Sequence, residues 1–216
     1  MKNLLEQIGK RLLLGAAIGT LAGLAGAGLA QTNSAPTALP GCCRAIKGAG
    51  PLSDKSVYQL TSEWTTDTGS QLRLENLQGK PQVVVMFFAS CQGACPILVH
   101  QMQQLAESLP ASARTNAGFL LVTFDSERDT PEVLKQYRDL RGLSEAQWTL
   151  LHGSPEDVRE LALVLGVRYR KVASGQFMHS NLITLLNAEG EIAFQQEGLG
   201  NSGVELVAQL RKLLPK

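Results

Sequence analysis

The stretch Val83-Val-Val-Met-Phe-Phe88, followed two residues later by Cys91-Gln-Gly-Ala-Cys95-Pro96, decides the fold of this chain. Six consecutive apolar residues are typical of a strand that is buried on both faces of a sheet. Pro96 fits the first turn of a helix, where its missing N–H costs no hydrogen bond. The stretch therefore predicts a central strand, a loop that holds two cysteines, and a helix that runs to about Ser108.

Strands and helices alternate along the rest of the chain, and this alternation predicts a sheet with parallel strands that helices cover. With a cysteine pair after the first buried strand, the pattern is thioredoxin-like: an α/β fold with a central mixed sheet flanked by helices and an N-terminal hairpin. The expected elements are a hairpin over 64–74, strands over 83–88, 118–124, 148–151, 181–186 and 191–195, and helices over 96–108, 131–142, 155–166 and 204–214. The expected helix caps are Asp129 or Thr130 before Pro131, and Ser154 before Pro155.

The N-terminal residues 1–30 form a segment of different character. Lys10 and Arg11 precede 19 uncharged residues, 12–30, of which 11 are Gly or Ala. A basic region before an apolar one is typical of a secretory signal, and the apolar stretch is also nearly long enough to span a bilayer. Both a signal peptide cleaved after Ala30 and a retained membrane anchor stay open. Either one places the following domain in the periplasm or an equivalent extracytoplasmic space, secreted or anchored to the inner membrane.

Residues 31–56 are rich in Pro, Gly, Ser and Ala and are expected to form a flexible tether before a domain over 57–216. The tether contains Cys42 and Cys43. Adjacent cysteines rarely bridge each other, because the resulting ring is strained. The alternatives are pairing with other thiols, a disulfide to another chain, or a soft-metal handoff site on the flexible arm.

Composition excludes several classes of protein. The chain has 216 residues, of which 44% are hydrophobic and 18% charged, which fits one globular domain with an appendage and excludes a disordered or fibrous chain. The net charge of +1 gives no electrostatic footprint for nucleic acid, so no nucleic-acid partner is expected. The positive charge lies in the first 50 residues, and the remaining 166 carry 15 basic and 18 acidic residues, a net charge of −3.

Cys91 and Cys95 carry the strongest chemical signal. Three intervening residues allow both sulfur atoms to lie on one small loop, where they can share a metal or oxidise to a disulfide. Cys95 is expected at the positive end of the helix dipole, which lowers the pKa of a thiol and favours the thiolate. A structural disulfide, a redox pair and a metal site all remain open from spacing alone.

His179 precedes the strand expected over 181–186, where a thioredoxin-like sheet brings the chain opposite the cysteine loop. Two thiolates and an imidazole suit Cu(I), Cu(II) or Zn(II). An ordinary thioredoxin has a cis-proline in this region, whereas this chain has no proline between Pro155 and Pro215, which weakens a general disulfide oxidoreductase. Met178 is expected to pack in the interior, although a thioether is also a soft donor.

Asp125 follows the second buried strand, on the side of the sheet where the site is expected. It is a candidate to orient a ligand or partner through a hydrogen bond. Arg128 is expected to pair with an acid and to fix this loop. His100 is expected to be a partly exposed helix residue and His152 a structural one.

Taken together, these motifs resemble the SCO/SenC family of copper-binding assembly proteins. The resemblance covers about residues 57–216. It rests on Cys91-x-x-x-Cys95-Pro96, on Asp125-x-x-Arg128-Asp129-Thr130-Pro131, and on His179-Ser180 before Leu182–Leu186.

The resemblance implies a thioredoxin fold that binds copper, as Cu(I), Cu(II) or both, through Cys91, Cys95 and His179. It also implies a copper donor and a copper-accepting partner, such as a subunit of cytochrome c oxidase, whose dinuclear centre receives copper or has its cysteines reduced. The family often has Asp immediately before the ligand histidine. This chain has Met178 there, so that position supplies no carboxylate to support the ligand.

The leading hypothesis is therefore a copper metallochaperone, in which reduced Cys91 and Cys95 bind copper and oxidation to a disulfide abolishes binding. The alternative is an enzyme, a thiol-disulfide reductase that uses Cys91 and Cys95 as a redox pair on a partner's cysteines. A peroxidase is disfavoured, because the chain lacks the Pro-x-x-x-Thr-x-x-Cys arrangement.

Overall fold

The computed structural model describes residues 51–215. The expected signal or anchor segment and the tether cysteines Cys42 and Cys43 lie outside the described residues. Within 51–215, no helix has the length and apolar character needed to cross a membrane. The described part carries its own sheet and hydrophobic core, which is the mark of an independently folding domain.

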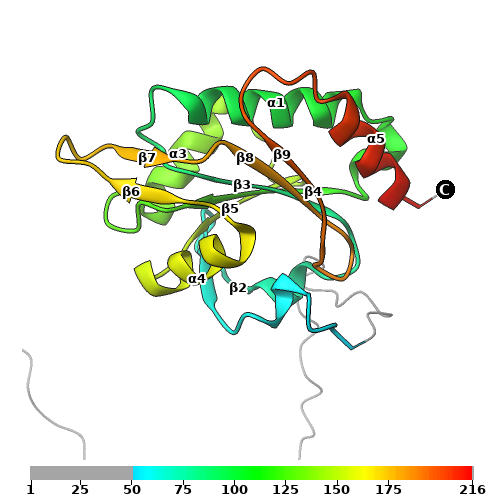
Figure 1. Cartoon of the computed structure of the whole chain (residues 1–216), viewed down its shortest axis with the longest axis horizontal. Helices are drawn as coiled ribbons and strands as arrows, with labels where there is room; N and C mark the ends of the chain where they lie inside the picture. Colours follow the sequence, from blue (N-terminus) through cyan, green and yellow to red (C-terminus); the bar gives the residue numbers. More distant parts are fainter. Residues whose placement is uncertain (1–50, 216) are drawn as a thin grey trace, which may run out of the picture. The chain divides into compact units, whose positions relative to one another are not determined.

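A seven-stranded mixed sheet forms the centre of this domain, with strand order β2-β1-β5-β4-β3-β8-β9 (Figure 1). The three central strands β3, β4 and β5 are parallel, and the outer strands pair antiparallel. The strands are β1 Glu63–Thr66, β2 Gln71–Arg73, β3 Gln82–Phe87, β4 Gly118–Thr123, β5 Trp148–His152, β8 Leu182–Leu186 and β9 Ile192–Glu197. Every residue of β3 and β4 is buried, as the uninterrupted apolar runs predicted.

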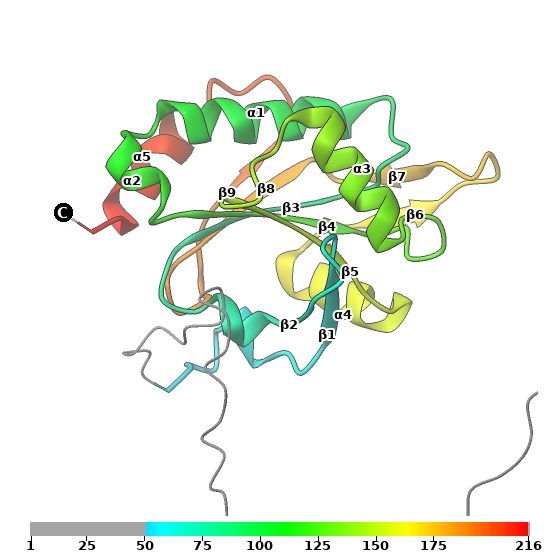
Figure 2. The same cartoon turned by 180° about the vertical axis from the view of Figure 1, so that it is seen from behind.

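Helices cover both faces of the sheet. The helices are α1 Ala94–Ser108, α2 Ala111–Arg114, α3 Pro131–Arg141, α4 Pro155–Leu165 and α5 Val204–Leu213. Helices α1, α3 and α5 lie on one face and α4 on the other, as the front and back views show (Figures 1 and 2). This arrangement confirms the expected α/β fold, with its N-terminal hairpin formed by β1 and β2.

The helix ends follow the sequence signals closely. Thr130 Oγ1 accepts a hydrogen bond from the N–H of Val133 at the start of α3, and Ser154 Oγ accepts one from the N–H of Asp157 at the start of α4. Of the two residues expected to cap α3, Thr130 is therefore the cap. Helix α1 begins at Ala94, two residues earlier than expected, so that Cys95 lies within its first turn.

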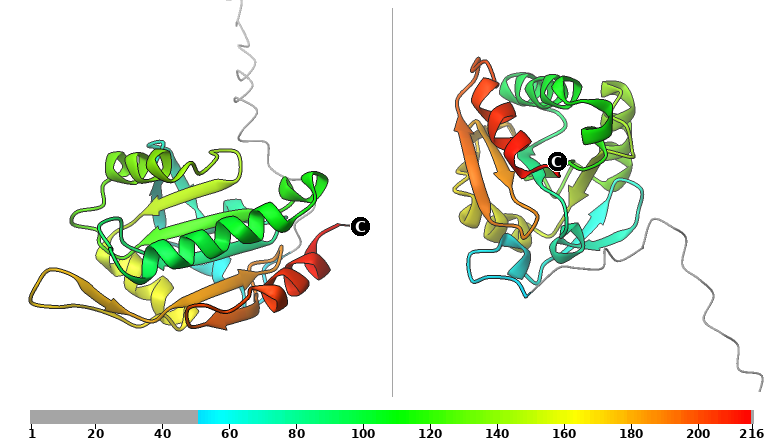
Figure 3. Two further views of the ribbon diagram at one scale, coloured as in Figure 1. Left: turned by 90° about the horizontal axis from the view of Figure 1, so that it is seen from above. Right: turned by 90° about the vertical axis from the view of Figure 1, so that its right-hand side faces the viewer.

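A second sheet of two strands was not expected from the sequence. Strands β6 Tyr169–Lys171 and β7 Phe177–His179 pair antiparallel, and their hairpin projects beyond the main sheet (Figure 3). Because side chains alternate along a strand, Phe177 and His179 share one face and Met178 takes the other. Met178 is 60% exposed, so the expectation that it packs in the interior was wrong.

The last residues of the expected tether contact the domain. Ser56 Oγ donates a hydrogen bond to the carbonyl of Glu189 at 2.5 Å, and the N–H of Val57 donates to the carbonyl of Gly190 at 2.9 Å. Ser53 Oγ hydrogen-bonds to the carboxylate of Glu191. The chain therefore enters the domain along the turn that joins β8 to β9.

Candidate metal centre

Cys91, Cys95 and His179 come together at one point of the structure. One ligand atom from each lies within 4.8 Å of the other two, and Cys95 Sγ lies 3.4 Å from His179 Nε2. Cys91 belongs to the loop after β3, Cys95 to the first turn of α1, and His179 is the last residue of β7. The structure thus brings together the three residues that the sequence nominated, from chain segments 84 residues apart.

The geometry of His179 leaves one ring nitrogen free for a metal. Nδ1 lies 3.1 Å from the carbonyl oxygen of Ser180. A carbonyl can only accept, so Nδ1 carries the proton and Nε2 has its lone pair directed toward the cysteines. The rings of Phe88 and Phe124 lie 6.2 and 5.2 Å from the imidazole and fix its position.

The two cysteines differ in exposure. Cys91 is half-buried, whereas Cys95 is 1% exposed, and neither is in a disulfide. Burial raises the pKa of the Cys95 thiol, and hydrogen bonds from backbone N–H groups lower it by less. The expectation that the pKa of this thiol is lowered was therefore wrong for the metal-free protein, because the cost of burying the thiolate outweighs the favourable effect of the helix end.

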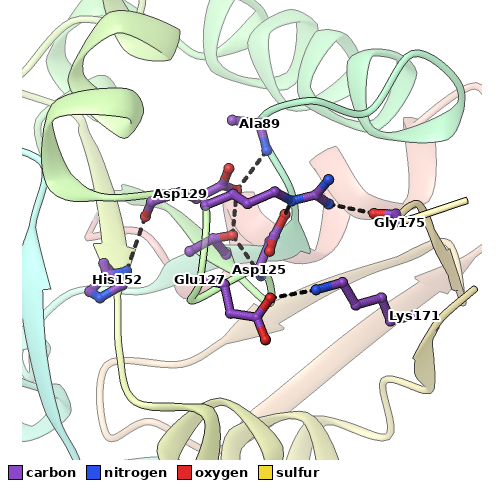
Figure 4. A network of polar contacts seen from close by, with 9 residues as sticks. Ala89, Asp125, Glu127, Asp129, His152, Lys171 and Gly175 are labelled. Atoms are coloured by element: carbon purple, nitrogen blue, oxygen red, sulfur yellow. Dashed lines mark hydrogen bonds and ion pairs between the residues drawn. The ribbon is translucent and has the colours of Figure 1, made fainter.

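Asp125 and Arg128 tie the β6–β7 hairpin to the loop after β4 (Figure 4). Arg128 Nε donates to the Asp125 carboxylate, and the other end of the guanidinium donates to the carbonyl of Gly175 at 2.6 Å. Lys171 of β6 pairs with Glu127 of the same loop. The expected pairing of Arg128 with an acid is confirmed, and through it the loop holds the hairpin that carries His179.

Asp125 itself is 1% exposed, and one of its carboxylate oxygens is buried without a hydrogen-bond partner. Its described partners are Arg128 and Thr123, whose hydroxyl accepts from the N–H of Asp125 at 3.0 Å. The sequence named Asp125 but could not name the carbonyl of Gly175 or the Lys171–Glu127 pair. The one available signal for the β6–β7 hairpin was Gly175, a residue typical of turns.

Asp129 holds the other side of the site. Its carboxylate accepts from the N–H of Ala89 at 2.8 Å and from the hydroxyl of Thr123 at 2.6 Å, and burial raises its pKa. Ala89 lies two residues before Cys91, so Asp129 fixes the start of the cysteine loop instead of capping α3. His152 Nδ1 donates to the carbonyl of Asp129 at 3.0 Å, which confirms a structural role for this histidine.

Two observations bear on what the site can do. His100 is exposed on α1 and takes no part in the cluster. Residues 51–215 contain no cis peptide bond, so the substrate-contacting cis-proline of a thioredoxin has no counterpart there. Two sulfur donors and one imidazole nitrogen form a set that fits a soft or borderline metal ion.

Similarity to known proteins identifies the family of this chain. A family model described as SCO1/SenC matches residues 53–214. The chain belongs to the SCO1/SenC family. Within this family, the SCO1 protein homolog of Bacillus subtilis is 27% identical over 161 residues, which are 72% of this chain and 82% of that protein. The SCO2-like protein RT0576 of Rickettsia typhi is 31% identical over 75 residues, 35% of this chain and 36% of that protein.

A solved structure shows that this SCO1/SenC protein shares the family's fold. Bradyrhizobium japonicum ScoI, solved with copper bound, superposes with a TM-score of 0.58 at 21% identity, over 71% of this chain and 97% of that one. At this identity the likeness establishes the thioredoxin-like fold, while the chemistry of the present chain follows from its own residues.

Proposed function

We propose that this SCO1/SenC protein is a copper metallochaperone, which binds copper and hands it to a protein with a copper centre. The observation that carries the proposal is the placement of Cys91, Cys95 and His179 within 4.8 Å of one another. Membership of the SCO1/SenC family and a family member solved with copper bound support the choice of metal.

The residues suggest how copper is held and released. Copper is the cargo, and the thiolates of Cys91 and Cys95 with Nε2 of His179 are its proposed ligands. A site with three protein ligands leaves room for a ligand from the partner. Cys91 is the more exposed cysteine, so we assign to it the first exchange of ligands with the acceptor. Asp125 is proposed to support the site from outside the ligand set, through Arg128.

We propose cytochrome c oxidase as the copper centre that is served, with a subunit of that enzyme as acceptor and a separate copper donor. The resemblance of the three motifs to copper-binding assembly proteins supports this choice. Residues 1–30 would be a signal peptide or membrane anchor, 31–56 a tether and 57–216 the copper-binding domain, in the periplasm or an equivalent space.

A second function uses the same cysteines without copper. As a thiol-disulfide reductase, the protein would reduce a partner's disulfide, with Cys91 attacking and Cys95 resolving the mixed disulfide. Two electrons and two protons then pass to the partner, and Cys91 and Cys95 end as a disulfide. The exposure of Cys91 beside the buried Cys95 favours this order of attack, and His179 has no necessary part in it.

Copper binding to the reduced fragment 51–216 tests the proposal. We expect one copper per chain and, for Cu(II), a thiolate charge-transfer band. His179→Ala should weaken binding and Cys91→Ser should weaken it further, whereas His100→Ala serves as the matched histidine control without effect. A copper affinity that is unchanged in both His179→Ala and Cys91→Ser would contradict the proposed metallochaperone site. Reduction of a disulfide-bearing peptide that persists in His179→Ala would then favour the reductase.

A further inference from the structure

The outward face of the β6–β7 hairpin carries an unusual set of side chains. Arg170 and Met178 lie directly opposite each other in the strand register. Arg168 comes next, and its N–H donates to the hydroxyl of Ser180 at 2.9 Å. Arg168, Arg170 and Met178 are exposed, and we call these three residues with Ser180 the cationic face. His179 points away from this face toward the cysteines.

The positive charge of the cationic face is not neutralised locally. Among residues 51–215, no carboxylate lies within 4.0 Å of the guanidinium of Arg168 or Arg170. Arg170 instead has one guanidinium nitrogen 3.7 Å from the sulfur of Met178. Lys171, the third cation of this segment, is paired with Glu127. Arg168 and Arg170 therefore contribute two positive charges without a paired carboxylate to a domain whose net charge is −3.

A hollow at the end of the hairpin away from its turn is lined by the cationic face and by Tyr169 and His179, which lie on the opposite face of the strands. This hollow is shallow and open, has a volume of about 330 Å³ and is lined by Arg168, Tyr169, Arg170, Met178, His179 and Ser180. His179 belongs both to its lining and to the cluster with Cys91 and Cys95. An exposed methionine flanked by arginines is typical of protein contact surfaces, in which these two residue types are enriched.

We propose that the cationic face docks the protein with which copper is exchanged, and that this partner presents carboxylates around its own copper ligands. This inference rests on the proposed metallochaperone function. Copper can change hands only when the partner's ligands come close to Cys91 and His179, and the cationic face borders that position. Charge complementarity accelerates such encounters by about 10- to 1,000-fold, and salt removes the effect.

The rate at which Cu(I) leaves the protein tests this inference directly. The Cu(I)-loaded fragment 51–216, which carries its own core, is mixed with two related chromogenic chelators, anionic bathocuproine disulfonate and neutral neocuproine. The variant Arg168→Glu/Arg170→Glu is compared with Lys55→Glu/Lys212→Glu. The control changes the net charge equally, on residues outside the hairpin.

We expect the reversal at Arg168 and Arg170 to slow extraction by the anionic chelator at least about tenfold at low salt. Extraction by the neutral chelator, and both rates in the control variant, should stay within twofold of the unaltered fragment. Added salt should slow the anionic chelator on the unaltered fragment. Equal slowing with both chelators, or no slowing with either, would overturn the inference.

The design separates this inference from the proposed function. Failure of the unaltered fragment to bind copper would contradict the proposed metallochaperone function. Normal copper affinity, with an extraction rate that does not depend on the charge of the chelator, would contradict only the proposed docking face. Sedimentation with vesicles of phosphatidylcholine and phosphatidylglycerol provides the remaining comparison. Binding to these vesicles that is lost in Arg168→Glu/Arg170→Glu would assign the cationic face to a membrane surface and overturn the protein partner.

Discussion

Cys95 is subject to two opposing effects at the level of a single residue. Its position in the first turn of α1 favours a negative charge, by about 0.3–1 kcal/mol at an exposed helix end. Its side chain is almost fully buried, and removal of a thiolate from water costs more than the dipole returns. The pKa of the thiol is therefore raised, and the free protein holds this candidate ligand as a neutral thiol.

The two cysteines should differ in reactivity. In the reduced, metal-free fragment 51–216, iodoacetamide should modify Cys91 at least about tenfold faster than Cys95, because only thiolates react and access is limited at Cys95. In Cys91→Ser, the pH profile for Cys95 should be displaced upward, so that its reactivity keeps rising above pH 9. Mass spectrometry of the modified peptides measures both rates. Equal rates in urea provide the control, and equal rates in the folded protein would refute the burial argument.

The direction of the Met178 side chain could not be predicted from the residue alone, because it depends on the register of strand β7. Histidine and methionine side by side are consistent with packing of either side chain. The register of β7 decides the matter: Phe177 and His179 face the aromatic cluster, and Met178 must face solvent. The three candidate ligands Cys91, Cys95 and His179 could be named from the sequence, because residue type and motif suffice for that. The direction in which a neighbouring side chain such as Met178 points could not be predicted in this way.

At the scale of elements, the loop over 125–129, which we call the bracket loop, connects the cysteine loop with the β6–β7 hairpin that carries His179. Asp129 holds the cysteine loop through the N–H of Ala89. Arg128 holds the β6–β7 hairpin through the carbonyl of Gly175, and is itself fixed by Asp125. The separation of Cys91 and Cys95 from His179 is therefore set by adjacent residues of one loop.

Loss of Arg128 should weaken copper binding through His179 alone. We expect Arg128→Ala to lower the copper affinity up to about tenfold, near the low end of what the loss of a supporting partner costs. The Cu(II) spectrum should lose part of its imidazole contribution while the thiolate band persists. Arg128→Ala combined with His179→Ala should bind copper no more weakly than His179→Ala does.

Lys171→Ala provides the matched control for this prediction. It breaks an exposed ion pair between the same hairpin and the same loop, and exposed pairs contribute little to stability because water screens them. Copper affinity should therefore change little in Lys171→Ala. Equal losses in the two variants would show that any contact to the hairpin suffices, and an additive loss in the Arg128 and His179 double variant would contradict action through His179.

The β6–β7 hairpin is the element that could not be predicted from the sequence. Strands β3 and β4 have six residues each and are apolar except for Gln82 at the start of β3 and Thr123 at the end of β4, so the sequence alone indicated them. Strands β6 and β7 have three residues each and contain Arg, Lys and His, so neither composition nor alternation distinguishes them from a loop. Gly175, at φ 77°, permits the turn between them. Tertiary contacts to Phe124 and to the bracket loop then fix the hairpin in place.

At the scale of the whole molecule, the topology gathers the site at one end of the sheet. The cysteine loop and the bracket loop follow the adjacent parallel strands β3 and β4, whose carboxyl ends meet at the same edge. The hairpin reaches that edge from β5 and α4, on its way to β8, which pairs with the other side of β3. A metal bound there connects distant parts of the chain, so copper binding and global stability should be coupled.

Copper should therefore stabilise the reduced fragment 51–216 and leave the oxidised one unchanged. A ligand at 100 times its dissociation constant adds about 2.7 kcal/mol to the free energy of unfolding, and less if the unfolded cysteines also bind it. Urea unfolding under anaerobic conditions, with Cu(I) buffered by a chelator, measures the gain. Oxidation of Cys91 and Cys95 to a disulfide removes two of three proposed donors, so the oxidised fragment should show no gain and His179→Ala a smaller one. An equal gain in the oxidised fragment would place the copper elsewhere and contradict the site.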